Sequence, residues 1–183
     1  MATDRLTRED WIDAASAALE RDGVAAVAVA PLATGLGVTR GSFYWHFASR
    51  DELVDAVLLR WEAVHSEAVL AEAEAVADPR ERLRALLGRA VLKPPTIFAG
   101  LLDAAGSEPL VAAALARAQA ARIAALERAC RECGLDPDEA RRRATLAHAA
   151  YVGLARLGPS GAGADASERA AFAEHVVRAL VPG

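Results

Sequence analysis

The sequence predicts an all-α protein with about nine helices. Ala, Leu, Arg and Glu, which are strong helix formers, dominate its 183 residues. No stretch alternates for long between apolar and polar residues, and runs of β-branched residues are absent. With 54% hydrophobic residues, a chain of this length can bury a core in one domain or in two small ones.

Cap residues mark the first predicted helix. Thr7 and Asp10 have the spacing of a capping box, with Asp in place of the usual Glu. Apolar residues then recur at helical spacing, and Gly23 is expected to end the helix.

Two short helices are expected next, separated by a tight turn at Gly37. The first fits the segment "APLATGL" at 30–36, where Pro31 is tolerated in the first turn. The second fits 39–45, with Thr39 as its N-cap.

Similar signals bound the later helices. Ser49 and Glu52 form the cap of a fourth helix, which continues with an apolar stripe beyond residue 60. Prolines, glycines and caps delimit the rest. One helix is expected to begin at "DPR" (78–80) and to stop at "KPP" (93–95), and a short helix follows it as far as Gly106. Ser107 is expected to cap a helix that runs to Gly134, and "DPDE" at 136–139 to begin one that runs to about Leu157. A flexible loop at 158–165 and a last helix from Asp165 to about Leu180 complete the chain.

Charge and export signals narrow the class of protein. The start "MATDRLTRED" carries no apolar block, and no run approaches the roughly 18–20 apolar residues of a membrane span. Two cysteines without an export signal fit the cytoplasm. The net charge is −4, and residues 1–60 carry six Arg against nine acidic residues, so a generally basic nucleic-acid binder is excluded.

The three helices before residue 48 have the layout of a helix-turn-helix, whose third helix enters the DNA major groove. Thr39 and Ser42 are small donors near the N-terminus of that helix, where backbone N–H groups favour a phosphate. Arg40 can bind guanine O6 and N7 or a phosphate. Gly41 allows the backbone to approach DNA closely.

Four aromatic residues crowd into 43–47 of a chain that has only nine. Tyr44 and His46 can donate to phosphate oxygens. Phe43 and Phe47 are expected to face inward and hold the third helix in place. The alternative is that the cluster is only an aromatic core plug beside a chance arginine.

Residues 5–65 resemble the DNA-binding domain of the TetR family of transcription regulators. The segments "DWIDAASAALERDG", "LATGLGVTRGSFYWHF" and "SRDELVDAVL" occur in the family's order and spacing. Residues 66–183 match only in length and helix layout, as expected for the family's antiparallel helical ligand-binding and dimerisation domain. The DNA-binding segment is expected at about 28–47.

The resemblance implies a ligand-responsive regulator and not an enzyme. It implies a homodimer on a near-palindromic operator of double-stranded DNA, released by a largely apolar small molecule, hence a repressor. No cofactor, metal or membrane partner is implied. Carried over to this sequence, the DNA contacts fall to Thr39, Arg40, Gly41, Ser42, Tyr44, Trp45, His46 and the phosphate-contacting Arg50.

The second helix departs from the family pattern. Where Ser, Thr or Arg are usual, this chain has Ala28, Ala30, Thr34 and Gly35. A missing side-chain cap costs about 1 kcal/mol, and an interior glycine about another 1 kcal/mol. We therefore expect modest DNA affinity with a shallow salt dependence.

The resemblance places the ligand pocket among the middle helices and the dimer interface on the last two. Plain core packing is the alternative for both sets of residues. Expected pocket residues are Trp61, His65, Phe98, Asp103, His148 and Tyr151, and expected interface residues are Leu146, Ala150, Gly153, Phe172, Val176 and Leu180.

Two motifs suggest other functions. Cys130 and Cys133 form a Cys-x-x-Cys, which would make the chain a thiol redox sensor, but both lie on the apolar stripe of their helix near its C-terminus, where a thiolate is disfavoured. Glu62 and His65 form half of the motif of a di-iron helical-bundle enzyme, and the sequence has no second copy.

Overall fold

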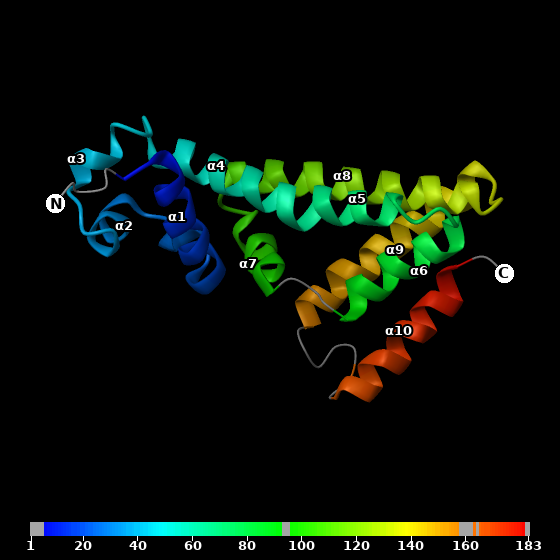
Figure 1. Cartoon of the computed structure of the whole chain (residues 1–183). Helices are drawn as coiled ribbons and strands as arrows, with labels where there is room; N and C mark the ends of the chain where they lie inside the picture. Colours follow the sequence, from blue (N-terminus) through cyan, green and yellow to red (C-terminus); the bar gives the residue numbers. More distant parts are fainter. Residues whose placement is uncertain (1–5, 93–95, 158–162, 164, 182–183) are drawn as a thin grey trace. The chain divides into compact units, whose positions relative to one another are not determined.

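The computed structural model describes residues 6–92, 96–157, 163 and 165–181, and all regular elements among them are helical (Figure 1). The all-α prediction is confirmed. The predicted stop at 93–95 and most of the predicted loop at 158–165 lie outside the described residues. The elements in order are α1 (Arg8–Asp22), a 3-10 turn η1 (Val24–Ala26), α2 (Val29–Gly35), α3 (Arg40–Phe43), α4 (Arg50–Glu62), a π-helical turn η2 (Ala63–Glu67), α5 (Ala68–Glu74), α6 (Pro79–Leu92), α7 (Thr96–Ala104), α8 (Pro109–Glu132), α9 (Pro137–Leu157) and α10 (Ala166–Leu180).

The fourth predicted helix is interrupted. It continues through α4, η2 and α5 without a loop, but residues 63–67 adopt a π-helical turn. Such turns are rare and occur frequently at functional sites. Sequence periodicity did not predict this one, because a single π turn shifts the apolar stripe without ending the helix.

Four of the predicted helix starts are confirmed by their hydrogen bonds, whereas the predicted cap Ser107 donates its hydroxyl to the carbonyl of Ala104 and α8 begins at Pro109. The backbone N–H of Thr7 donates to Asp10 Oδ2 over 2.6 Å, and that of Asp10 donates to Thr7 Oγ1 over 3.3 Å. The backbone N–H of Glu52 donates to Ser49 Oγ over 3.2 Å. Asp136 and Asp165 accept in the same way from the backbone N–H of the residue three positions on.

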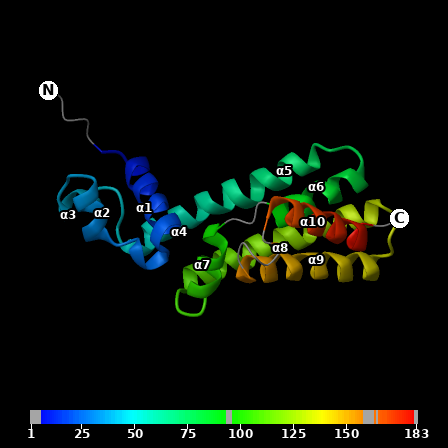
Figure 2. The same ribbon diagram turned by 90° about the horizontal axis from the view of Figure 1, so that it is seen from below.

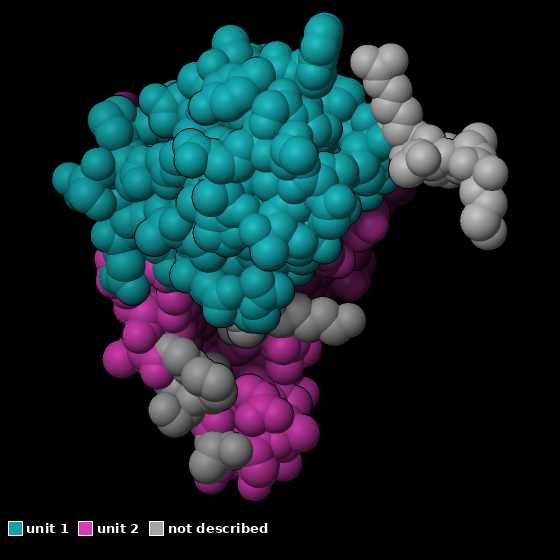
Figure 3. All heavy atoms as spheres, turned by 90° about the vertical axis from the view of Figure 1, so that its left-hand side faces the viewer, with its two compact units in different colours: residues 1–62, 100–115 teal, residues 63–99, 116–183 magenta. Residues whose placement is uncertain are grey.

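The chain divides into two compact units, which Figure 3 colours separately. The first comprises residues 1–62 and 100–115, and the second comprises 63–99 and 116–183. The predicted domains, 5–65 and 66–183, break close to the first of these boundaries. The C-terminal part of α7 and the first turns of α8 belong to the first unit, which a division by sequence alone did not anticipate.

Aromatic and aliphatic side chains of α1, α3 and α4 form the core of the first unit. Trp11, Phe43, Phe47 and Leu53 are all at most 1% exposed. Ile12, Leu19, Leu32, Val54, Val57 and Leu58 complete this core.

In the second unit, α6 packs along α10 and against α9 (Figures 1 and 2). Small residues contribute to the core of this unit: Ala129 of α8 and Ala140 and Ala144 of α9 are completely buried. The same core includes Leu83, Leu87, Leu126, Cys130, Ala147, Leu180 and Val181.

Helix α8 is the one helix among the described residues that is long and apolar enough to cross a membrane by length and composition alone. Much of its apolar character comes from alanine. Its exposed positions include Arg117, Gln119 and Arg128, while Ala118 and Ala129 are buried.

Candidate DNA-binding surface and ligand pocket

The turn between α2 and α3 is built by a glycine in the left-handed conformation. Gly37 has φ +69°. Its N–H donates to the carbonyl of Thr34 over 3.1 Å, and the N–H of Val38 donates to the carbonyl of Ala33 over 3.0 Å. These two bonds make a Schellman motif, which ends α2 and turns the chain directly into α3.

Helix α3 is shorter than predicted, with four residues instead of 39–45. The aromatic residues of α3 and of the turn after it face two ways. Phe43 and Phe47 are at most 1% exposed, and their rings stack at 5.5 Å, with Phe43 edge-on to Trp11 at 5.3 Å. Tyr44 and Trp45 are 59% and 79% exposed. The core-plug interpretation therefore describes only the two phenylalanines, as the sequence predicted for them.

The predicted DNA-contacting residues lie together at α3 and the turn after it. Thr39, Arg40 and Gly41 are exposed, and Ser42 and His46 are half-buried. Thr39 occupies the N-cap position, but its side chain makes no capping hydrogen bond.

Among the residues that the structure describes, no neighbour requires a glycine at position 41. A Cβ built there would meet only the hydroxyl oxygen of Thr39, at 3.6 Å, which is ordinary contact. The backbone at Gly41 is therefore exposed without a side chain, at the point where the sequence predicts close approach to DNA.

Arg50, predicted to contact phosphate, is directed largely inward. Its Nε donates to the carbonyl of Val27 over 2.8 Å, and one Nη donates to the carbonyl of Val24 over 3.1 Å. The same Nη lies 3.4 Å from Glu108 Oε1, and the other lies 3.7 Å from Asp51. Arg50 thus fastens the connection between α1 and α2 to the start of α4.

Helix α2 lacks a side-chain cap, as predicted, since its N-cap residue Ala28 makes no such hydrogen bond. The expected cost of an interior glycine is wrong. Gly35 is the last residue of α2 and not an interior one, and the Schellman motif beginning there favours small residues.

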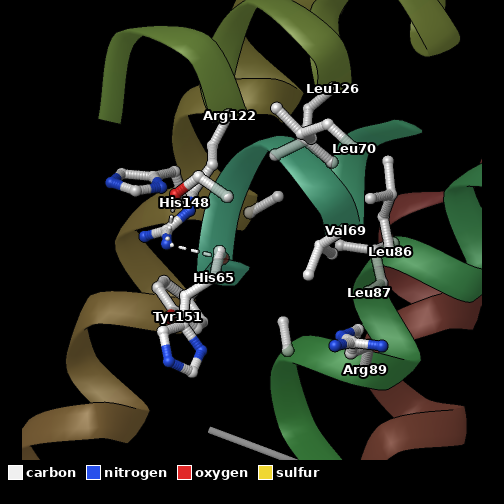
Figure 4. Close-up of a pocket in the computed structure, with 13 residues that line it drawn as sticks. His65, Val69, Leu70, Leu86, Leu87, Arg89, Arg122, Leu126, His148 and Tyr151 are labelled. Carbon is white, nitrogen blue, oxygen red and sulfur yellow. Dashed lines mark hydrogen bonds between the residues drawn. The ribbon is translucent and has the colours of Figure 1, made fainter. Parts of the chain in front are cut away.

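A cavity of about 290 Å³ lies in the second unit (Figure 4). Three of the six predicted pocket residues line it: His65, His148 and Tyr151. Phe98 lies behind Tyr151, with ring centroids 4.9 Å apart. The remaining lining residues were not predicted: Ser66, Val69, Leu70, Leu86, Leu87, Arg89, Ala90, Arg122, Leu126 and Ala147.

Two of the predicted pocket residues lie elsewhere. Trp61 is 4% exposed in α4, and Asp103 is exposed on α7; both belong to the first unit and neither lines the cavity. Both were expected there because the resemblance places the pocket among the middle helices, and this expectation does not determine which side of the bundle a residue faces.

Arg122 of α8 is the main unpredicted polar residue of the cavity. It donates to Ser66 Oγ over 2.8 Å and to the carbonyl of His65 over 3.1 Å, so it contacts the π-helical turn η2. Its guanidinium also lies 5.2 Å from the ring centroids of both Phe98 and Tyr151. The available signal was an arginine between Ala118, Ala125 and Ala129 on the buried stripe of an alanine-rich helix.

His148 of α9 faces the same cavity and is 5% exposed. Its Nε2 has no hydrogen-bond partner in the structure. Burial, together with the charge of Arg122, lowers the pKa of His148 to about 4, so the imidazole is neutral at pH 7. Burial raises the pKa of the neighbouring Tyr151 phenol.

The surroundings of the two cysteines disfavour the thiolate form. Cys130 is 3% exposed, and burial raises the pKa of its thiol to about 11. Burial also raises the pKa of Cys133. Within the described parts of the chain, no group of three or more His, Cys, Asp or Glu side chains is arranged to hold a metal ion.

The expected dimer residues divide between surface and core. Leu146 of α9 is 59% exposed, and Ala150 and Gly153 on the same helix are half-buried. Leu180 of α10 is 8% exposed within the core of the second unit, and Phe172 and Val176 pack against buried residues of that unit. Leu157, which was not predicted, extends the exposed line of α9 at 65% exposed.

These features define an all-helical protein with a helix-turn-helix in one unit and a small cavity in the other. Residues 12–57 match the sequence model of the bacterial regulatory proteins of the tetR family. The HTH-type transcriptional regulator TtgR of Pseudomonas putida is 42% identical over 82 residues, which cover 44% of this chain and 39% of TtgR. The resemblance of the N-terminal helix-turn-helix to the TetR family is confirmed by these matches.

Solved structures extend the likeness to nearly the whole fold. The reduced form of NemR from E. coli has a TM-score of 0.78 at 16% identity, covering 96% of this chain and 97% of NemR. AibR, solved with isovaleryl coenzyme A and operator DNA, has a TM-score of 0.71 at 18% identity and covers 96% and 98%. At these identities the likeness concerns the fold. By sequence, the chain matches only about two fifths of the length of the curated relatives.

We expect Arg50→Met to lower the free energy of unfolding by about 2 kcal/mol, because it removes hydrogen bonds from a charged donor and leaves the carbonyls of Val24 and Val27 without it. Urea unfolding measures the change. Glu108→Gln is the matched control, since a partly exposed ion pair contributes less than about 1 kcal/mol. Equal effects of the two variants would show that the carbonyl contacts do not hold the connection in place.

Because His148 is buried in its neutral form, we expect the second unit to lose stability at acidic pH. Because its pKa is near 4 in the folded state and about 6.5 when unfolded, the unfolded state binds the proton first as the pH falls. Stability should therefore decline between pH 6.5 and pH 4. The variant His148→Phe should flatten this decline, whereas His175→Asn, at an exposed position, should not. Unfolding curves at several pH values test this, and an unchanged slope in His148→Phe would contradict it.

Proposed function

We propose that this chain is a DNA-binding transcription regulator, and specifically a repressor that a small molecule releases from its operator. One observation carries the proposal: the two phenylalanines of the aromatic cluster anchor α3 in the core, while Arg40, Tyr44 and Trp45 point outward. A helix that is anchored on its buried face and presents hydrogen-bond donors and aromatic rings on its exposed face is suited to insertion into the DNA major groove.

The cavity supports ligand control. It lies beside η2, and η2 continues without a loop into α4, which carries Arg50 at its first residue. Arg50 in turn holds the chain just before α2. A ligand that favours one arrangement of this helical run would shift the population of states able to bind DNA. The presence of isovaleryl coenzyme A in the AibR structure supports the same kind of control.

The proposed protein acts as a homodimer. Operator half-sites lie about 34 Å apart, so two recognition helices must be held at that spacing. The proposed contact face is the line on α9 formed by the exposed Leu146 and Leu157 and the half-buried Ala150 and Gly153. Of the α10 residues expected at the dimer interface, Phe172 and Val176 remain candidates for the rim of that interface. Leu180 is buried in the core of the second unit.

The thiol-sensor alternative has little support. A thiol with a pKa of about 11 is almost entirely protonated at pH 7, and the thiolate is the reactive form. If Cys130→Ser left an oxidant response of DNA binding unchanged, the alternative would be removed.

The decisive experiment is fluorescence anisotropy with DNA from upstream of the chain's own gene, at moderate salt and with random DNA as competitor. Saturable binding that survives the competitor supports the proposal. We expect modest affinity and a shallow salt dependence, because the first 60 residues carry a net charge of −3. If neither this DNA nor fragments selected from genomic DNA bind at any salt concentration, the proposal fails.

Arg40→Ala should cost about 1–3 kcal/mol on the operator and much less on random DNA, because a guanidinium that reads guanine contributes to sequence discrimination. Anisotropy titrations on both DNAs measure the difference. Equal losses would show that Arg40 contacts only phosphate.

Gly41→Ala should weaken DNA binding without destabilising the fold. The new methyl group meets no close neighbour in the protein, and alanine is up to about 1 kcal/mol more favourable than glycine in a helix. Thermal unfolding should therefore show an equal or higher midpoint, while anisotropy shows weaker binding. Unchanged affinity would mean that DNA does not approach the backbone at this point.

A further inference from the structure

The buried stripe of the run α4–η2–α5 shifts by one residue at the π-helical turn. Leu58 and Trp61 are buried in α4, and a regular α-helix would continue this stripe through Ala68 and Glu72. Both of these residues are exposed, and Ala73 is buried instead. A π-helical turn closes its hydrogen bonds over five residues instead of four, so η2 takes up one extra residue and keeps the charged Glu72 outside.

Arg122 of α8 holds this turn from outside the helix. Its guanidinium donates to the carbonyl of His65 over 3.1 Å and to Ser66 Oγ over 2.8 Å, and both acceptors belong to the turn. Ser66 is 3% exposed, so this contact is shielded from water, where a hydrogen bond from a charged donor is strong. The rings of Phe98 and Tyr151, each 5.2 Å from the guanidinium carbon, keep the side chain in position.

The cavity of the second unit is lined by the same groups. His65, Ser66 and Arg122 all face it, together with Val69 and Leu70, which follow the turn (Figure 4). A molecule that occupies the cavity therefore meets the contacts that hold the turn, and it can replace them with its own.

The turn also lies where the chain passes between the two units. The first unit contains the run as far as Glu62, and the second begins at Ala63, the first residue of the turn. At the other end of α4, Arg50 holds the chain before α2. A change in the turn therefore acts on the helix that secures the helix-turn-helix.

We propose that Arg122 keeps the π-helical turn in the form that binds DNA, and that an effector in the cavity acts by displacing Arg122 from the turn. In a repressor that a ligand releases, the state held by the protein's own contacts is the one that binds the operator. This regulation rests on the proposed function, whereas the hold of Arg122 on the turn can be measured without DNA.

Amide hydrogen exchange of the full chain tests the hold. Arg122→Met should speed exchange at residues 63–67 by about tenfold or more, because the turn loses both bonds from α8. Ser66→Ala removes only one of these bonds and should have a smaller effect at the same residues. Arg128→Met is the matched control, because this exposed arginine of α8 pairs with Glu74 of α5 and does not line the cavity.

Unchanged exchange at 63–67 in a folded Arg122→Met chain would overturn the proposal, and so would an equal change in Arg128→Met. If Arg122→Met does not fold, Ser66→Ala decides in the same way, since it leaves the contacts of Arg122 with Phe98 and Tyr151 in place.

Deletion of Ala63 tests whether the turn accommodates an extra residue. Ala63 is exposed, and its removal restores regular spacing while the buried stripe stays where it is. We expect an equal or higher midpoint of thermal unfolding. Deletion of the exposed Ala71, in the regular helix α5, should lower the midpoint by about 5 °C or more, because it moves Ala73 out of the core. Equal losses from the two deletions would contradict the proposal.

Anisotropy on the operator then connects the turn to DNA binding. Arg122→Met should weaken operator binding by about tenfold or more, because it leaves the turn in the state that the effector produces. In the chain without Ala63 the same substitution should have little effect, because a regular helix needs no hold. Equal weakening in both chains, or none in a folded Arg122→Met chain, would overturn the regulation.

The two proposals fail separately. If the unmodified chain binds no DNA, the proposed function is lost and the exchange experiment still decides whether Arg122 holds the turn. If the chain binds its operator and Arg122→Met leaves that binding unchanged, only the regulation is lost.

Discussion

A four-residue helix has no stability of its own in water, so α3 depends on tertiary contacts such as the burial of Phe43 against Trp11 of α1. Phe47, stacked on Phe43, fixes the chain where it leaves the turn after α3. Edge-on and stacked aromatic contacts add about 0.5–1.5 kcal/mol each to the effect of burial. The orientation of the exposed side chains from 39 to 46 depends on these contacts.

The helical run α4–η2–α5 connects the two halves of the proposed mechanism within one continuous element. One end begins at Arg50, which holds the chain before α2, and the other carries His65 and Ser66, which receive Arg122. The π turn lies where those contacts are made. A helix with one irregular turn can lose or regain that turn without breaking, which provides a physical basis for two states.

Local signals predicted the helices well, because caps, glycines and prolines act within a few residues of where they stand. Thr7, Ser49, Asp136 and Asp165 all cap the helices that the sequence assigned to them. The site depends on packing between distant segments, so the sequence predicted it only in part. The sequence predicted that Phe43 faces inward. It did not predict the role of Arg122, whose partners lie 56 and 57 positions away. Leu180 faced the core because α10 packs along α6, which no spacing within α10 reveals.

The three tryptophans differ in their exposure to solvent, so their intrinsic fluorescence can be used to follow one region of the protein. Trp11 and Trp61 are 0% and 4% exposed, whereas Trp45 is 79% exposed and stands among the residues proposed to meet DNA. A soluble quencher such as iodide can therefore collide with only one of the three indoles. The fluorescence that iodide quenches therefore comes from Trp45 and reports on the surface proposed to contact DNA. Protection of this fluorescence from quenching would show that DNA is bound, without any attached dye.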